Sequence, residues 1–257
     1  MKMNKQHFRI SVTRDMSVHG FLVQPDHNIW NNKHTVFIFS HGWSVDGTES
    51  FRLFIDISNK LISLGYPCFL FDYRGSGYSD LAFEDMTFST EVADLDAVIK
   101  FARKKFPRYR IVLWGVSFGC AVAAQVSSQR KDVSLLVLWS LSAELYRRYC
   151  EKLGTDIFEK GYIYTEKGFI VKAAFLESLK GWDTYKAIKE SNIPCLLVHG
   201  DADTGASIDL ARNAHRIAEK NTTLYEIKGG NHGFKSQPLL LKEAIDLTLN
   251  WLQPFLK

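Results

Sequence analysis

The serine at position 117 has the surroundings of a catalytic nucleophile. Residues 115–119 read Gly-Val-Ser-Phe-Gly, and they stand between an apolar run at 111–114 and a stretch of small residues. A strand, a tight turn and a helix predict a nucleophile elbow, in which glycines flank a serine held in a strained conformation. The N-terminus of the helix favours developing negative charge. The alternative is an ordinary strand–turn–helix that carries a serine, so the rest of the chain must decide.

Serine needs a base to remove its proton and an acid to orient that base, and candidates for both lie downstream. His232 is the predicted base, because it follows the last predicted strand in a glycine-flanked loop. Asp203 is the predicted acid, in the loop after the preceding strand. Asp201, two residues earlier, is the competing acid, and Glu144 is a third, more distant candidate.

An oxyanion hole requires two backbone N–H groups directed at the oxygen that becomes negatively charged. One predicted donor is the amide of Phe118, the residue after the nucleophile. The other is the amide of Trp43, in the loop that follows a predicted strand at 35–39. The alternative for Trp43 is a core aromatic residue, and its ring could also line an acyl pocket.

These loops require a sheet whose strands end along one edge. Repeated strand–helix units predict a mostly parallel sheet covered by helices on both faces, with functional loops at the carboxyl ends of the strands. The first two strands are expected to be antiparallel. The eight predicted strands lie at 7–13, 17–24, 35–39, 67–71, 110–114, 133–141, 193–198 and 222–228. Predicted helices include one at about 49–64 and another at about 206–219.

The segment from about 143 to 180 departs from this alternation. It is polar, aromatic and charged, and two short strand-like runs around residues 166–168 predict a hairpin. We interpret it as a small cap inserted over the sheet of a single domain that covers residues 1–257. Its aromatic side chains could build an apolar acyl site or the core of the cap itself.

The composition excludes several classes of protein. No apolar segment is long enough to span a bilayer, and the first residues lack the apolar core of a signal peptide. The four cysteines have no spacing that suggests zinc, so we expect reduced thiols, no metal and a cytoplasmic location. The net charge of +4 is modest, and the basic run at 103–110 is expected to be a solvated helix end rather than a nucleic-acid site.

A cofactor is also not expected. The sequence Asp72-Tyr73-Arg74-Gly75-Ser76-Gly77 is glycine-rich, but it has no Walker lysine and no third glycine at dinucleotide spacing. A structural loop, in which Asp72 and Arg74 tie neighbouring turns together, is the preferred interpretation. The sequence leaves open whether the chain forms homo-oligomers.

Together these motifs resemble those of the α/β-hydrolase superfamily, and they occur in the order found there. They are His41-Gly42, Asp72-x-Arg74-Gly75-x-Gly77-x-Ser79, Gly115-x-Ser117-x-Gly119, His199-Gly200-x-x-Asp203 and Gly230-x-His232. Within the superfamily, the chain length, the compact cap and the aromatic residue after His-Gly are similar to bacterial cinnamoyl/feruloyl-type carboxylesterases. One departure is Thr204-Gly205-Ala206, where many relatives carry valine or proline, so the packing beside Asp203 is open.

The residues and the resemblance lead to the same expected chemistry. The resemblance implies the α/β-hydrolase fold and a serine hydrolase that cleaves small-molecule acyl esters through an acyl-enzyme intermediate. A thioesterase, an acyltransferase or a small peptidase would use the same three residues, and the triad alone does not separate them. A binding protein of this fold that has lost catalysis is a further alternative.

Overall fold

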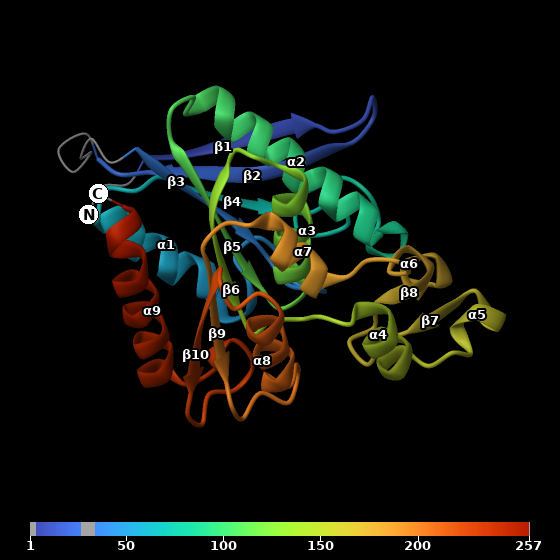
Figure 1. Ribbon diagram of the computed structural model, residues 1–257. Helices are drawn as coiled ribbons and strands as arrows, with labels where there is room; N and C mark the ends of the chain where they lie inside the picture. The colour runs from blue at the N-terminus through green and yellow to red at the C-terminus, as the bar shows by residue number, and fades with distance from the viewer. Residues whose placement is uncertain (1–3, 27–33, 257) are drawn as a thin grey trace.

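The centre of the molecule is a twisted eight-stranded sheet (Figure 1). The computed structural model describes residues 4–26 and 34–256. The order across the sheet is β1-β2-β4-β3-β5-β6-β9-β10. β2 runs antiparallel to both of its neighbours, and every pairing from β4 onwards is parallel. The strands are β1 (Asn4–Ser11), β2 (Ser17–Gln24), β3 (Thr35–Ser40), β4 (Cys68–Asp72), β5 (Arg110–Val116), β6 (Val133–Trp139), β9 (Cys195–Gly200) and β10 (Thr222–Ile227).

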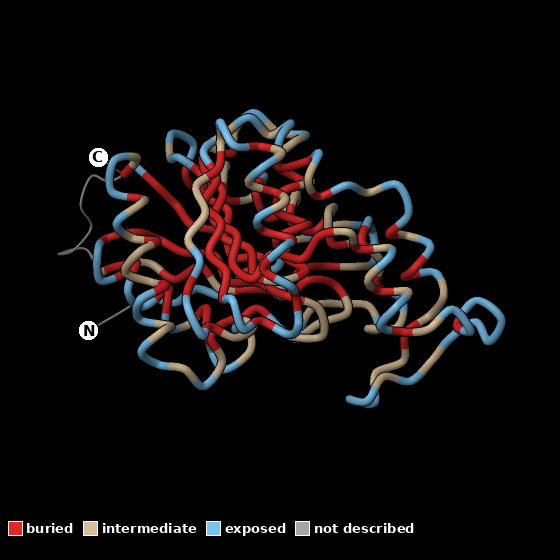
Figure 2. The backbone as a smooth tube through the Cα atoms, turned by 60° about the horizontal axis from the view of Figure 1, so that its bottom comes forward, coloured by how far each residue is buried: buried red, intermediate tan, exposed pale blue. Residues whose placement is uncertain are grey.

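Helices cover both faces of the sheet, which is why the central strands are apolar throughout. In β3, Val36 and Ile38 belong to one core, and Phe37 and Phe39 belong to the core on the opposite face. Figure 2 shows this buried region running through the middle of the molecule. On one face lie α1 (Leu53–Ser63) and α9 (Pro238–Leu252); on the other lie α2 (Phe88–Lys105), α3 (Phe118–Gln129), α7 (Thr184–Ser191) and α8 (Ile208–Ile217). The predicted mostly parallel sheet with helices on both faces is confirmed.

A group of small elements lies at one end of the molecule, beyond the sheet (Figure 1). It consists of α4 (Leu145–Leu153), α5 (Ile157–Lys160), β7 (Tyr162–Tyr164), β8 (Ile170–Lys172) and α6 (Ala173–Ser178). β7 and β8 pair antiparallel, with Tyr162 opposite Lys172, so the predicted hairpin is confirmed. The Lys172 ammonium binds Glu84 and Asp85, which ties the hairpin to the main body. These elements fall in the range where the sequence predicts the cap.

Some element boundaries differ from the predicted ones. β1 lies at 4–11 instead of 7–13. α1 begins at Leu53 instead of 49, because Glu49, Phe51 and Arg52 all have positive φ, at 59°, 56° and 61°. β6 ends at Trp139 rather than 141, since Ser140 has a φ of 51° and turns the chain. The described residues also contain four short 3-10 turns, which are η1 (Ser50–Arg52), η2 (Phe83–Asp85), η3 (His232–Phe234) and η4 (Gln253–Phe255).

Candidate active site

Ser117 occupies the turn between β5 and α3, in the strained conformation that the sequence predicts. Its φ is 56° and its ψ is −121°. A Cβ atom at Gly115 would lie 2.7 Å from the carbonyl oxygen of Gly119, and one at Gly119 would overlap the carbonyl oxygen of Ser40. Both positions therefore need glycine for steric reasons. The Ser117 N–H donates to the Trp139 carbonyl oxygen at 3.0 Å, which fixes the turn against β6.

The structure brings Ser117, His232 and Asp203 together from three separate loops. His232 Nε2 lies 3.0 Å from Ser117 Oγ. On the other side of the ring, His232 Nδ1 lies 2.8 Å from Asp203 Oδ2 and 3.0 Å from Oδ1. The Asp203 side chain is fully buried, whereas 23% of the His232 side chain is exposed. The hydroxyl end of this hydrogen-bonded series is therefore accessible to a substrate, whereas the carboxylate end is shielded from water.

The Asp203 carboxylate is held ionised by several hydrogen-bond donors. Its Oδ1 atom accepts the backbone N–H groups of Gly205 and Ala206, each at 2.8 Å. Its Oδ2 atom lies 3.2 Å from His199 Nε2. Burial alone would raise the pKa of Asp203, but the bonds from His199 and His232 outweigh it and lower the pKa well below the usual range. The sequence Thr204-Gly205-Ala206 thus supplies two donors to the acid.

His199 is a further residue of this network, and its tautomer follows from its partners. Its Nδ1 atom accepts the Leu141 N–H at 3.2 Å, so the ring proton is on Nε2. Nε2 lies 2.8 Å from the Ala206 carbonyl oxygen and also close to Asp203 Oδ2. The sequence does not predict the contact with Asp203.

The two competing acids have other partners. Asp201 Oδ1 accepts the backbone N–H of Gly229 at 2.6 Å. Glu144 Oε2 binds the guanidinium of Arg147, and its Oε1 atom accepts the Tyr185 hydroxyl at 3.0 Å. In the described parts of the chain, the only carboxylate that bonds to His232 is therefore that of Asp203.

The loops that carry the acid and the base pack backbone against backbone. A Cβ atom at Gly200 would overlap the carbonyl oxygen of Gly230, so no side chain fits between them. The Ala202 N–H donates to that same Gly230 oxygen at 3.0 Å. On the far side of His232, the Gly233 N–H donates to Ser140 Oγ at 2.9 Å. The spacing of the loops that carry Asp203 and His232 is thus fixed by main-chain contacts.

The two predicted oxyanion donors are the backbone N–H groups of Trp43 and Phe118. No acceptor in the described residues bonds to either N–H group. The loop that carries Trp43 passes close to the serine, since a Cβ atom at Gly42 would lie 3.4 Å from Ser117 Cβ. Glu49 holds this loop: its Oε2 atom accepts the Gly42 N–H at 2.6 Å.

Glu49 is a residue of the site that the sequence analysis misses. It is buried, has a φ of 59°, and its second oxygen accepts the Ser50 N–H at 2.8 Å. No motif marks it, because it acts through the backbone of a loop seven residues earlier rather than through another side chain.

Aromatic side chains join the site to the cap-like segment. The Trp43 ring stacks on Phe175 of α6 with centroids 5.7 Å apart, and Tyr149 of α4 meets it edge-on at 5.3 Å. Phe118 contacts both Tyr149 and Phe175. Of the aromatic residues whose role the sequence leaves open, Tyr149 and Phe175 are therefore buried between the two parts of the molecule, whereas Tyr164 is exposed.

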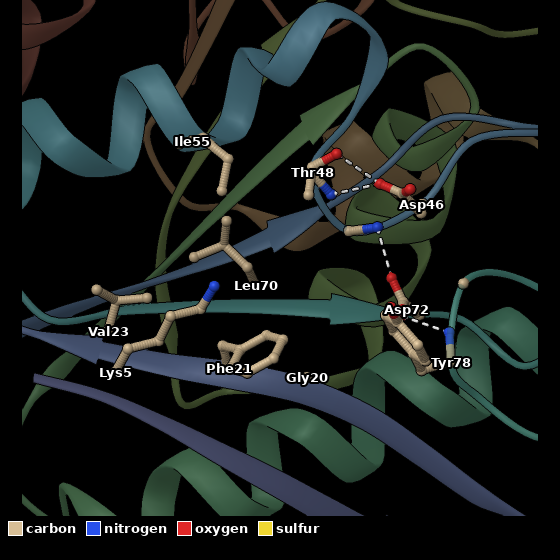
Figure 3. Close-up of a pocket in the computed structure, with 12 residues that line it drawn as sticks. Lys5, Gly20, Phe21, Val23, Asp46, Thr48, Ile55, Leu70, Asp72 and Tyr78 are labelled. Atoms are coloured by element: carbon tan, nitrogen blue, oxygen red, sulfur yellow. Dashed lines mark hydrogen bonds between the residues drawn. The ribbon is translucent and has the colours of Figure 1, made fainter.

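The glycine-rich loop after β4 is structural, in agreement with its interpretation from the sequence. Asp72 accepts the backbone N–H groups of Gly47 and Tyr78, at 2.7 and 2.8 Å, and so ties two loops together (Figure 3). Arg74 forms a buried ion pair with Asp94 at 2.6 Å. The pocket in Figure 3 has a volume of about 110 Å³ and is lined by neither Ser117 nor His232.

Residues 4–26 and 34–256 contain neither a metal site nor a membrane-spanning helix. No group of His, Cys, Asp and Glu side chains there is arranged to hold a metal ion. No helix in the same residues has the length and apolar character needed to cross a membrane. The four cysteines are free, and burial raises the pKa of the thiols of Cys68, Cys120 and Cys195.

Comparison with solved structures identifies the architecture. Est1E from Butyrivibrio proteoclasticus, in a structure with ferulic acid bound, superposes with a TM-score of 0.82 over 95% of this chain and 98% of that chain, at 20% identity. The protein has the α/β-hydrolase fold. The esterase Pf2001 of Pyrococcus furiosus shares this fold, with a TM-score of 0.73 over 99% of this chain and 92% of that chain, at 19% identity.

Sequence comparisons agree with the structural ones. A family model described as "Serine aminopeptidase, S33" matches residues 31–150 of this chain. The AB hydrolase superfamily protein YisY of Bacillus subtilis is 25% identical, over 76% of this chain and 84% of its own length. The predicted resemblance to the α/β-hydrolase superfamily and to feruloyl esterases is confirmed.

Proposed function

We propose that this α/β-hydrolase is a serine esterase that cleaves carboxylic esters of small molecules through an acyl-enzyme intermediate. The observation that carries the proposal is the continuous chain from Ser117 Oγ to His232 Nε2 at 3.0 Å and from His232 Nδ1 to Asp203 Oδ2 at 2.8 Å. Serine is a weak nucleophile unless a base takes its proton, and this chain supplies the base and its orienting acid.

The proposed reaction has two halves. Ser117 Oγ attacks the ester carbonyl carbon while His232 Nε2 takes the hydroxyl proton, and Asp203 stabilises the imidazolium that forms. The carbon–oxygen bond to the alcohol then breaks, and His232 gives the proton to the departing alkoxide. Water, deprotonated by His232, attacks the acyl-enzyme, which releases the acid and restores the Ser117 hydroxyl.

The tetrahedral intermediates carry a negative oxygen that needs fixed donors. We assign this role to the N–H groups of Trp43 and Phe118, which have no acceptor among the described residues; Phe118 follows Ser117, and Trp43 follows Gly42, whose backbone abuts Ser117. Preorganised donors of this kind contribute on the order of 3 kcal/mol each to stabilisation of the transition state. The N-terminus of α3 adds to the positive potential at the same point.

A peptidase is the second candidate, because the matching family model is described as a serine aminopeptidase. An aminopeptidase must bind the α-ammonium group of its substrate, for which a carboxylate beside the nucleophile is needed. The cavity beside Trp43 is lined by two lysines, Lys152 and Lys167, and by one carboxylate, that of Glu166, and this net positive charge favours the esterase.

The test is a comparison of initial rates on 4-nitrophenyl acyl esters, methyl hydroxycinnamates, an acyl thioester and aminoacyl 4-nitroanilides. We expect ester turnover that falls about a millionfold in kcat in Ser117→Ala and in His232→Ala. A fluorophosphonate probe should label the wild type but not Ser117→Ala. Turnover of the anilides alone would select the peptidase, and no turnover together with no labelling would leave a binding protein.

A further inference from the structure

A cavity of about 380 Å³ opens next to the candidate oxyanion loop. Trp43 and Ser44 form its inner wall, and the end of α4 and the β7–β8 hairpin form the others, with Lys152, Tyr164 and Lys167 among the lining residues. Trp43 directly follows Gly42, whose backbone abuts Ser117. The cavity therefore begins one residue along the chain from the backbone that abuts Ser117.

The two lysines that line this cavity, Lys152 and Lys167, have no carboxylate partners. In residues 4–26 and 34–256, no carboxylate lies within ion-pair distance of either lysine, or of Arg148 and Lys235, whose charges also act on Lys152. Other cations of the same segment differ, since Lys160, Lys172, Lys180 and Arg147 all have acidic partners. The lysines of the cavity are thus cations without a counter-ion in the described residues.

Two further cations contact the loops that carry Asp203 and His232. Arg148 extends from α4, and its guanidinium donates to Ser142 Oγ at 2.9 Å and to the Gly205 carbonyl oxygen at 2.6 Å. Gly205 in turn lies against the His232 ring. Lys235 folds over Gly233, the residue after His232, with its Cε atom 3.6 Å from a Cβ atom placed there.

Lys152 is the cation placed best to contact a ligand. Its Nζ atom stands 4.8 Å from the centre of the Trp43 ring and 5.7 Å from that of Tyr149. Desolvation lowers the pKa of Lys152, and repulsion by Lys167, Arg148 and Lys235 lowers it further. An ammonium group that is partly desolvated and repelled by its neighbours gains from a bound anion.

One carboxylate near Lys152 opposes the positive charge of these cations. Glu166, at the turn of the hairpin, also lines the cavity and raises the pKa of Lys152. It lies beyond ion-pair distance of every described lysine, however, so it neutralises none of them directly. Two lysines, Lys152 and Lys167, against a single acid leave the lining of the cavity with a net positive charge.

We propose that the cavity selects esters that carry a carboxylate on the acyl or the alcohol part, and that Lys152 is the main contact of that carboxylate. This proposal rests on the proposed function, because it names the substrate class of the same site. Trp43 contributes an apolar wall along which the linking atoms of the substrate lie, and Lys152 fixes the charged end. Selection then depends on the distance, within the substrate, between the ester carbonyl group and the carboxylate.

The experiment measures kcat/KM for two pairs of esters. The acyl-side pair is 4-nitrophenyl hemiglutarate and neutral 4-nitrophenyl pentanoate. The alcohol-side pair is the butyrate ester of 7-hydroxycoumarin-3-carboxylate and that of 7-hydroxycoumarin. In at least one pair, we expect the charged ester to be preferred about tenfold over the neutral one, and this preference to shrink as ionic strength rises.

Variants test whether Lys152 is responsible. In Lys152→Met the ratio of charged to neutral kcat/KM should fall about tenfold, and in Lys152→Arg it should be largely kept. The matched control is Lys131→Met, which removes an exposed lysine at the opposite end of β6 and should leave both rates unchanged. Thermal unfolding of each variant checks that it is folded.

Two results would overturn the proposal: no preference for the charged ester in either pair, or a ratio that Lys152→Met does not alter. Failure of the proposed function is a separate result, since it would appear as absent turnover of the neutral esters too. In that case calorimetric titration of Ser117→Ala with monomethyl glutarate still tests the cavity. Binding that Lys152→Met weakens about tenfold supports the anion site, and binding that it leaves unchanged refutes it.

Discussion

In an Asp203→Asn variant, the amide NH₂ group would lie against another hydrogen-bond donor in either orientation of the side chain. In the wild type, Asp203 Oδ1 accepts two backbone N–H groups at 2.8 Å, and Oδ2 faces His232 Nδ1 at 2.8 Å and the protonated Nε2 of His199 at 3.2 Å. An amide has one accepting and one donating end. If the oxygen stays with Gly205 and Ala206, the NH₂ group points at both histidines, and the reverse orientation sets it against two N–H groups.

The first orientation has a direct consequence for catalysis. An NH₂ group at the Oδ2 position donates to His232 Nδ1, so the ring proton moves to Nε2, the atom 3.0 Å from Ser117 Oγ. That atom then has no lone pair with which to accept the serine proton. We expect kcat of Asp203→Asn to fall about ten-thousandfold, equivalent to about 5 kcal/mol of transition-state stabilisation.

The assay is saturating hydrolysis of a 4-nitrophenyl ester, with circular dichroism to confirm folding. Asp201→Asn is the matched control, because exposed Asp201 accepts only the Gly229 N–H and an amide oxygen can do the same. It should retain kcat within about threefold. An Asp203→Asn enzyme within tenfold of wild type, or an equal loss in Asp201→Asn, would refute the assignment of the acid.

Three further outcomes are expected. Glu49→Gln sets an NH₂ group against the N–H of Gly42 or Ser50, so kcat should fall about 10- to 100-fold with little change in KM; an unchanged kcat would show that the loop holds its position without the carboxylate. Gly119→Ala places a methyl group on the carbonyl oxygen of Ser40, and urea unfolding should show a loss of about 2–4 kcal/mol; a loss below about 0.5 kcal/mol would contradict the tight packing. Because folding lowers the pKa of Asp203, its stabilisation is complete above the unfolded value of about 4 and is lost as pH falls through the folded pKa. The difference in unfolding free energy between wild type and Asp203→Asn, roughly 1–3 kcal/mol at neutral pH, should therefore shrink at pH 3.5, and a constant difference would argue against an ionised Asp203.

The sequence predicts the central sheet well, because buried parallel strands have a simple pattern. β3, β4 and β5 are short apolar runs that end in motif residues, and their positions differ little from the predicted ones. β1 is predicted three residues late at its start. It is an edge strand in which Phe8 alone is fully buried, so its alternation is a weak signal.

The residues of the site also divide into those that local sequence motifs predict and those that they do not. Ser117, His232 and Asp203 are found from local motifs, because each needs glycines or a strand end in its own loop. Glu49 and the His199–Asp203 contact are missed, because they depend on how distant loops pack. The cations of α4 are missed for a related reason: on a helix with charged residues all along it, only the folded structure shows which side faces the cavity.

The contact between Gly200 and Gly230 sets how this protein should lose activity on heating. The loops that carry the acid and the base are spaced by main-chain atoms at the ends of β9 and β10, where no side chain fits between Gly200 and Gly230. Fluctuations of the surrounding side chains therefore leave the spacing of the two loops intact, and only opening of this edge of the sheet changes it. Heat inactivation should then coincide with the loss of amide protection along β10.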